Sequence, residues 1–207
     1  MDFNTEAINW DNEKRVRRAN IIANEILKEL QIKDDNTALE FGCGTGLVSF
    51  NLYDKFKHIT LVDTSKGMID TLKSKIQDSE ITNMTALQIL QNIELAVEDK
   101  YDVIYTSMAL HHVNDVSATL NSLYKLLKNE GYICIIDLIE DDGSFHKSEK
   151  DFHGHNGFNQ NELKNLLTEV GFRDVKSNVF YEDYKIIDDT KINYSLFIMV
   201  GKKQSKK

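Results

Sequence analysis

The chain has 207 residues, of which 41% are hydrophobic and 28% are charged, and its formal net charge is −8. This composition is typical of one globular domain and excludes a disordered or fibrous protein. The acidic balance argues against a nucleic-acid partner, and no apolar stretch is long enough to cross a bilayer, so we expect neither nucleic acid nor membrane as a partner.

The first predicted element is an amphipathic helix over about residues 12–31, where apolar side chains recur at three- and four-residue spacing. Asp11 or Asn12 is its expected cap. Short apolar runs then alternate with helical patterns, which is typical of βαβ units and a parallel sheet. The predicted strands are 37–41, 58–62, 85–90, 101–106 and 131–138, and the predicted helices are 47–53, 66–77 and 116–127.

The pattern changes after residue 138. Residues 139–159 are polar and form a loop longer than most connections, which indicates a functional segment. A helix over 159–170 ends at Gly171, and strands over 175–181 and 193–201 form an antiparallel hairpin at one sheet edge. We expect a single domain over 1–207, with a helical cap (1–33), a cofactor-binding core (34–140), a lid or substrate loop (141–158), a C-terminal helix and hairpin (159–201) and a solvated tail (202–207).

The most informative segment is the glycine-rich turn Glu40-Phe41-Gly42-Cys43-Gly44-Thr45-Gly46, which follows a predicted strand. Glycines let the backbone approach a ligand closely. The next strand ends at Asp63, 21 residues after Gly42, where a carboxylate accepts hydrogen bonds from the ribose of a nucleotide-like cofactor. The glycine spacing differs from the GxGxxG dinucleotide fingerprint, and the chain has no GxxxxGK[ST] phosphate loop.

Five segments resemble the motifs of class I S-adenosylmethionine-dependent methyltransferases, in order and spacing, over about residues 36–201. The segments are EFGCGTG, LVDTSKGMI, KYDVIYTSMALHHVND, LLKNEGYICIIDL and HNGFNQNELKNLLTEVGF. The chain is most similar to the small-molecule enzymes related to ubiquinone and menaquinone biosynthesis. The resemblance implies an α/β Rossmann-like three-layer sandwich with a seven-stranded, mostly parallel sheet, order 3-2-1-4-5-7-6, strand 7 antiparallel, and an added N-terminal helix.

The resemblance also implies S-adenosylmethionine at the carboxyl ends of strands 1, 2 and 4, in agreement with the general rule for open α/β sheets. Glu40 is expected to reach the cofactor amine and Asp63 the ribose. An amide of Gln91 or Asn92 replaces the acid that the family uses at the adenine. The full set of expected cofactor residues is Glu40, Gly42, Cys43, Gly44, Gly46, Asp63, Thr64, Ser65, Met68, Gln91, Asn92 and Ser107.

Methyl transfer needs alignment of donor and acceptor, and a base only where the acceptor must lose a proton. His111 and His112 follow strand 4 and are the candidate catalytic residues, because imidazole titrates near neutrality. The candidate substrate residues are His153 and His155 on the long loop, and Trp10, which either covers the site or fixes the first helix.

One basic residue, one possible metal site and the two cysteines remain. Arg18 either contacts a carboxylate of substrate or cofactor or lies on a solvated helix face. The loop histidines and Glu149 lack a complete set of metal ligands, so we expect no metal. The only cysteines, Cys43 and Cys134, form no CxxC pair, and the N-terminus is not a signal peptide, so we expect a cytoplasmic protein.

The predicted function is therefore methyl transfer from S-adenosylmethionine to a small molecule, by a monomer or homodimer. Two alternatives are a non-catalytic module that binds the same cofactor and a nicotinamide-dependent oxidoreductase. The acidic charge argues against a nucleic-acid methyltransferase, and the [ND]PP[YF] motif of the amino-methylating type cannot occur in a chain without proline.

Overall fold

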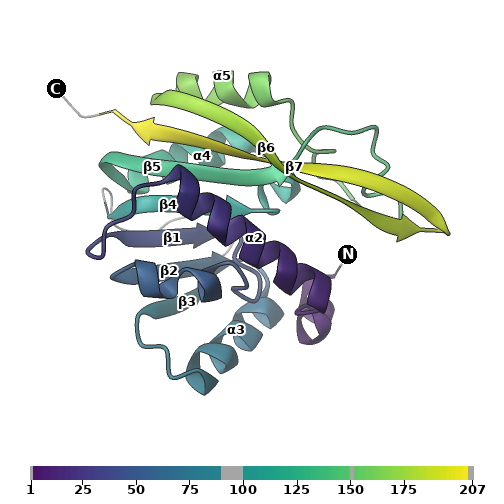
Figure 1. The fold of residues 1–207 in the computed structure, drawn as a ribbon, viewed down its shortest axis with the longest axis horizontal. Coiled ribbons are helices and arrows are strands. Elements are labelled where there is room, and N and C mark those ends of the chain that lie inside the picture. Colours follow the sequence, from purple (N-terminus) through teal and green to yellow (C-terminus); the bar gives the residue numbers. More distant parts are fainter. Residues whose placement is uncertain (1, 90–99, 150–151, 205–207) are drawn as a thin grey trace.

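A computed structural model describes residues 2–89, 100–149 and 152–204 (Figure 1). The described chain contains one seven-stranded sheet of order β3-β2-β1-β4-β5-β7-β6, and only β7 runs antiparallel to its neighbours, which confirms the expected topology. The strands are β1 (Thr37–Phe41), β2 (His58–Asp63), β3 (Met84–Gln88), β4 (Tyr101–Ser107), β5 (Leu127–Leu138), β6 (Phe172–Ile187) and β7 (Thr190–Lys203).

Helices cover both faces of the sheet because successive strand residues point to opposite sides. Ala38 of β1 packs with the helix α2 side of the core, whereas Leu39 packs with the helix α4 and α5 side. Figure 1 shows α2 in front of the sheet and α4 behind it. The α-helices are α1 (Phe3–Glu6), α2 (Glu13–Glu29), α3 (Lys66–Asp78), α4 (Val116–Leu126) and α5 (Gln160–Val170), and the 3₁₀ helices are η1 (Ala7–Asn9), η2 (Ser49–Asn51), η3 (Tyr53–Lys55) and η4 (Leu110–His112).

Two predicted helix boundaries are confirmed by local geometry. The Asn12 side chain caps α2 by accepting a hydrogen bond from the Arg15 amide at 3.0 Å. Gly171 ends α5 in the left-handed conformation, with φ of 114°.

The predicted helix over 47–53 is wrong, since the chain forms the short 3₁₀ helices η2 and η3 there. The Asn51 side chain donates to the Leu47 carbonyl at 2.8 Å, and the Asn51 amide bonds to Val48 instead. In an α-helix, the Asn51 amide would instead donate to the Leu47 carbonyl. A run of seven residues with such a competing side chain is too short to sustain an α-helix.

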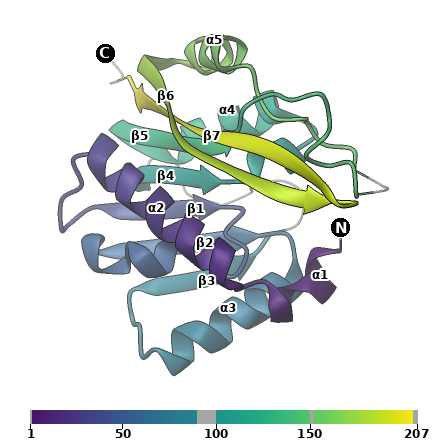
Figure 2. The same ribbon diagram turned by 45° about the vertical axis from the view of Figure 1, so that its right-hand side comes forward.

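The C-terminal hairpin is confirmed but is much longer than predicted, and β5 also begins four residues earlier. A two-residue turn at Asp188 and Asp189, with φ of 47° and 58°, joins β6 to β7. The distal half of the hairpin extends past the rest of the sheet, toward the N-terminal end of α2 (Figure 2). Because this distal half pairs with no described strand beyond the hairpin itself, its sequence is polar and lacks the alternation of apolar residues that would predict a strand.

The predicted solvated tail is wrong for Lys202 and Lys203, which belong to β7. Lys203 is only 2% exposed, and its ammonium donates to the Leu127 carbonyl. Lys202 forms an ion pair with Glu130 at 2.6 Å. In the part of the chain that the structure describes, no helix combines the length and the apolar character that a membrane crossing requires.

Candidate functional site

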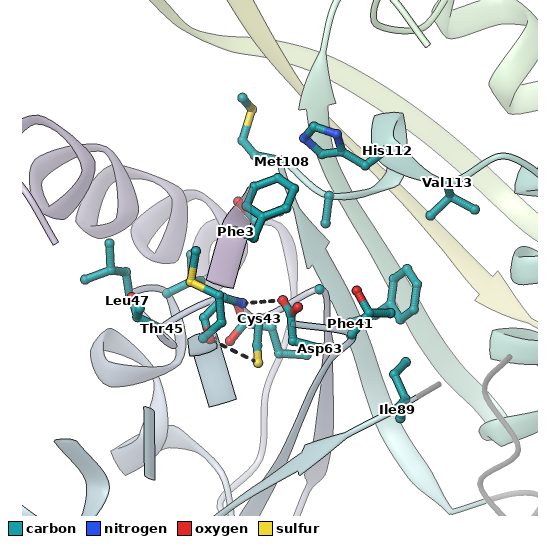
Figure 3. A pocket seen from close by; sticks show the side chains of 18 of the residues that line it. Phe3, Phe41, Cys43, Thr45, Leu47, Asp63, Ile89, Met108, His112 and Val113 are labelled. Carbon is teal, nitrogen blue, oxygen red and sulfur yellow. Dashed lines mark hydrogen bonds between the residues drawn. The ribbon is translucent and has the colours of Figure 1, made fainter. Parts of the chain in front are cut away.

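A cavity of about 540 Å³ opens at the carboxyl ends of β1, β2 and β4. Its walls include the glycine-rich turn, the end of β2 and η4, and residues Phe3 and Trp10 cover it from the N-terminal segment. Figure 3 shows the Phe3 ring between His112 and the turn that carries Cys43 and Thr45. Ligands of open α/β sheets bind at this edge.

Gly42 lets two backbone segments meet at the base of the cavity. Its φ is 69°, a conformation that side chains disfavour, and an added Cβ would lie 2.3 Å from the Ala109 Cβ. The Gly42 amide bonds to the Val62 carbonyl at 2.9 Å, which ties the turn to the end of β2. Only glycine fits this position.

Asp63 is held at the end of β2 by backbone amides. One carboxylate oxygen accepts from the Gly44 amide and the other from the Ser65 amide, each at 2.8 Å (Figure 3 draws the Gly44 bond). Burial raises the pKa of Asp63, and these backbone hydrogen bonds oppose the rise. Each oxygen keeps a lone pair for a further donor, such as a ribose hydroxyl.

Glu40 is the buried acid of the cavity, with 2% exposure. Ser49 donates to its carboxylate, and the Ser49 and Tyr105 hydroxyls lie 2.6 Å apart. Burial raises the pKa of Glu40 to about 8, and the charge of Asp63 adds to the rise. Among the described residues no basic side chain lies within ion-pair distance of Glu40, so a cationic ligand would stabilise its ionised form.

The N-terminal segment is fastened over this site. The Asn4 side chain accepts from the Gly67 amide at 2.9 Å and from the Ser65 hydroxyl at 3.0 Å. Asp11 accepts from the Thr45 hydroxyl and forms an ion pair with Lys75. We call residues 3–11 the roof, since they span from α3 to the glycine-rich turn.

The two candidate catalytic histidines have different surroundings. His112 lines the cavity, with its ring 5.1 Å from the Phe3 ring. Burial and the neighbouring His111 and His146 lower the pKa of His112 to about 3, so it stays neutral at physiological pH rather than titrating near neutrality as expected. His111 is 1% exposed, and its Nδ1 lies 2.5 Å from an oxygen of the buried Asp137.

On the long loop, the histidine that lies near His112 is His146, whereas the sequence predicted that His153 and His155 would contact the substrate. His146 is buried and stacks on Phe152 with ring centroids 3.6 Å apart. Its Nδ1 lies 2.9 Å from Glu149, and its Nε2 has no hydrogen-bond partner among the described residues. His153 is exposed, and His155 bonds to the Val113 carbonyl at 3.0 Å.

The structure gathers most of the sequence-predicted residues around one cavity. Gly46, Ser65, His111, His153 and His155 lie outside its lining, and Gln91 and Asn92 fall outside the described residues. No group of three or more metal-ligating side chains occurs within residues 2–89, 100–149 and 152–204. The predicted residues that line the cavity are Trp10, Glu40, Gly42, Cys43, Gly44, Asp63, Thr64, Met68, Ser107 and His112.

Sequence reasoning missed Phe3 and Asp137. Asp137 lies one residue before the end of a predicted strand, outside the cavity lining, and its carboxylate holds His111, a contact that no local pattern shows. Phe3 precedes every predicted element, and no pattern in the sequence points to it.

Comparison with known proteins identifies the family. A sequence model described as a methyltransferase domain matches residues 13–177. A malonyl-[acyl-carrier protein] O-methyltransferase of Priestia megaterium is 33% identical over 135 residues, which cover 62% of this chain and 47% of that protein. A ubiquinone biosynthesis O-methyltransferase of Hydrogenovibrio crunogenus is 22% identical over 94% of this chain and 90% of that protein.

Among solved structures, a SAM-dependent methyltransferase of Aquifex aeolicus has the same fold, with a TM-score of 0.69 and 18% identity over 96% of this chain and 97% of that one. The chain spans about half the length of most of the curated relatives it matches. With more than half of its residues matched by the family model, the chain belongs to the methyltransferase-domain family.

Proposed function

We propose that the enzyme methylates a small-molecule acceptor that enters the cavity beneath the roof. The observation that carries this proposal is the enclosed space itself: Glu40, Asp63 and His112 line one cavity of about 540 Å³ that Phe3 and Trp10 cover. This volume lies within the range of about 300–1,000 Å³ that is usual for cofactor and small-molecule sites. The chain's net charge of −8 also favours a small acceptor over a nucleic acid.

The residues present fit S-adenosylmethionine. Glu40 would hold the methionine ammonium, because a buried carboxylate with only hydroxyl partners is stabilised by a cation. Asp63 would hold the ribose hydroxyls, with its orientation fixed by the Gly44 and Ser65 amides. Met68, 1% exposed on α3, lines the same cavity and would pack on the adenine.

When bound, S-adenosylmethionine supplies an activated methyl group that is transferred by in-line displacement. The chain itself aligns the acceptor and excludes water. Phe3, Met108 and Val113 give the space beside His112 an apolar wall. His112, neutral at physiological pH, would accept or donate one hydrogen bond to the acceptor without carrying charge.

Calorimetry with S-adenosylmethionine and turnover to S-adenosylhomocysteine over a panel of small acceptors test this function. Asp63→Ala should weaken cofactor binding by about tenfold or more, since hydrogen bonds to a charged group contribute about 1.5–3 kcal/mol. The matched control is Asp70→Ala, which removes an exposed acid of α3. Equal affinity in the two variants would refute the ribose contact, and cofactor binding without turnover of any acceptor would favour the non-catalytic module.

A further inference from the structure

One wall of the cavity carries a guanidinium without a carboxylate partner. Arg18 of α2 lines the cavity, and its Nη1 donates to the Tyr194 hydroxyl of β7 at 3.3 Å. Within the described residues, no Asp or Glu oxygen comes within 4 Å of the Arg18 side chain. A partly buried guanidinium normally pairs with an anion, because its desolvation is otherwise uncompensated.

The cofactor accounts for only one of the two guanidiniums that line the cavity. S-adenosylmethionine has a single carboxylate, whereas both Arg15 and Arg18 line the wall. Arg15 lies over the Trp10 ring at 3.8 Å and donates to the Trp10 carbonyl at 3.2 Å. Trp10 in turn lies against Gly44 of the glycine-rich turn. Arg15 is therefore the guanidinium beside the cofactor loop, and Arg18 is one turn further along α2.

A second cation lies near Arg18. The Lys185 ammonium of β6 is 3.7 Å from the centre of the Phe145 ring, and Phe145 lies 5.0 Å from the ring of Tyr194, the partner of Arg18. Burial lowers the pKa of Lys185, and the charge of Arg18 lowers it further, whereas Glu149 and Asp141 oppose the shift. Phe145, Lys185 and Tyr194 lie outside the cavity lining, and the Tyr194 hydroxyl also donates to the Asp183 carboxylate at 3.3 Å. We call Arg18 and these three neighbours the cationic corner.

We propose that Arg18, the residue of the cationic corner that lines the cavity, binds an anionic group of the acceptor, so that the enzyme acts on small organic acids with an apolar or aromatic body. This inference rests on the proposed function of the cavity. Arg18 supplies a planar fork that matches the oxygens of a carboxylate or a phosphate. The charge of Lys185 adds to the positive potential at Arg18, and the cavity residues Phe3, Met108 and Val113 supply an apolar surface for the acceptor body.

The test is calorimetric binding of three matched probes to the protein saturated with S-adenosylhomocysteine: benzoate, phenyl phosphate and benzamide. The acids should bind about tenfold or more tighter than the neutral amide, and Arg18→Gln should remove that preference. Arg18→Lys should keep part of it. The matched control is Arg17→Gln, which removes the same charge from the exposed face of α2 and should leave the preference intact. Whichever of benzoate and phenyl phosphate binds more tightly shows whether the site prefers a carboxylate or a phosphate.

Three results would overturn the proposal. The first is no preference for the acids over benzamide, including no binding of any of the three probes. The second is an equal loss of preference in Arg17→Gln. The third is an Arg18→Gln variant that binds S-adenosylhomocysteine about tenfold more weakly but keeps its affinity for 5′-methylthioadenosine, since Arg18 then binds the cofactor carboxylate. Failure of the wild type to bind S-adenosylhomocysteine would instead refute the proposed function, and it is measured separately.

Discussion

The buried acid Glu40 makes cofactor affinity depend on pH. With a pKa of about 8, Glu40 is protonated in most free molecules at pH 7. If the cofactor ammonium binds beside it, the complex favours the carboxylate, and binding releases a proton. We therefore predict that S-adenosylmethionine binds more tightly as the pH rises from 6 toward 8.

The size of the effect follows from the ionised fraction of Glu40. That fraction is about one hundredth at pH 6 and about one tenth at pH 7, so affinity should rise about tenfold between the two, equivalent to about 1.4 kcal/mol. The gain should flatten near pH 8, because the amino group of the cofactor itself loses its proton at about 7.7–8.0.

The assay is isothermal titration calorimetry at pH 6 and pH 7, repeated at pH 7 in buffers of different ionisation enthalpy. The wild type should release about 0.9 proton per cofactor bound at pH 7. Glu40→Gln, which mimics the protonated acid, should release none and show the same affinity at both pH values. An unchanged wild-type affinity from pH 6 to 7, with no proton released, would refute the assignment of Glu40 to the ammonium.

Three further predictions concern the glycines and the free protein. Gly42→Ala should lose about 1–3 kcal/mol in urea unfolding and most of its cofactor affinity, because the new Cβ meets Ala109 in a strained conformation; a variant that binds normally would contradict this packing. Gly67→Ala adds a Cβ 2.5 Å from the Asn4 carbonyl oxygen, but alanine also favours helix α3 by about 1 kcal/mol. We therefore expect unchanged or higher thermal stability together with faster proteolysis of the roof. The variant Asn4→Ala should show the faster proteolysis without the gain in stability. Equal proteolysis of Gly67→Ala and wild type would show that the roof tolerates the clash. Finally, the pKa of Glu40 is about 8 in the folded state and 4.5 in the unfolded chain, so the folded state keeps the proton between these pH values. The cofactor-free protein should therefore lose about 1.6 kcal/mol of stability in total from pH 6.5 to 8, and Glu40→Gln should not. A melting temperature that falls equally in both proteins would assign the loss to other groups.

The sequence predicted the sheet and its cofactor edge because both depend on local patterns. Apolar runs separated by helices specify a parallel sheet, and the glycine-rich turn and Asp63 lie where two parallel strands end. These features require no knowledge of contacts between distant segments. The order of the strands came from the resemblance to methyltransferases, and the structure has the same order.

The parts that sequence did not predict depend on contacts between distant segments. His146, rather than His153 or His155, is the loop histidine near His112, because the packing of the loop determines which side chain turns inward. The partners of Glu40 come from Ser49 and Tyr105, which are 9 and 56 residues away. The prediction of a helix over 47–53 was wrong because the Asn51 side chain competes for the Leu47 carbonyl.

The length of the β6–β7 hairpin places two residues of the cationic corner beyond the region that the family model matches. Glu40, the glycine-rich turn and Asp63 lie inside the region that the family model matches, residues 13–177. Lys185 and Tyr194 lie on the extended hairpin, after that region ends. On the proposed function, substitutions near the hairpin turn would alter the neighbours of Arg18 and leave Glu40, the glycine-rich turn and Asp63 unchanged, so relatives with the same donor site would differ in acceptor.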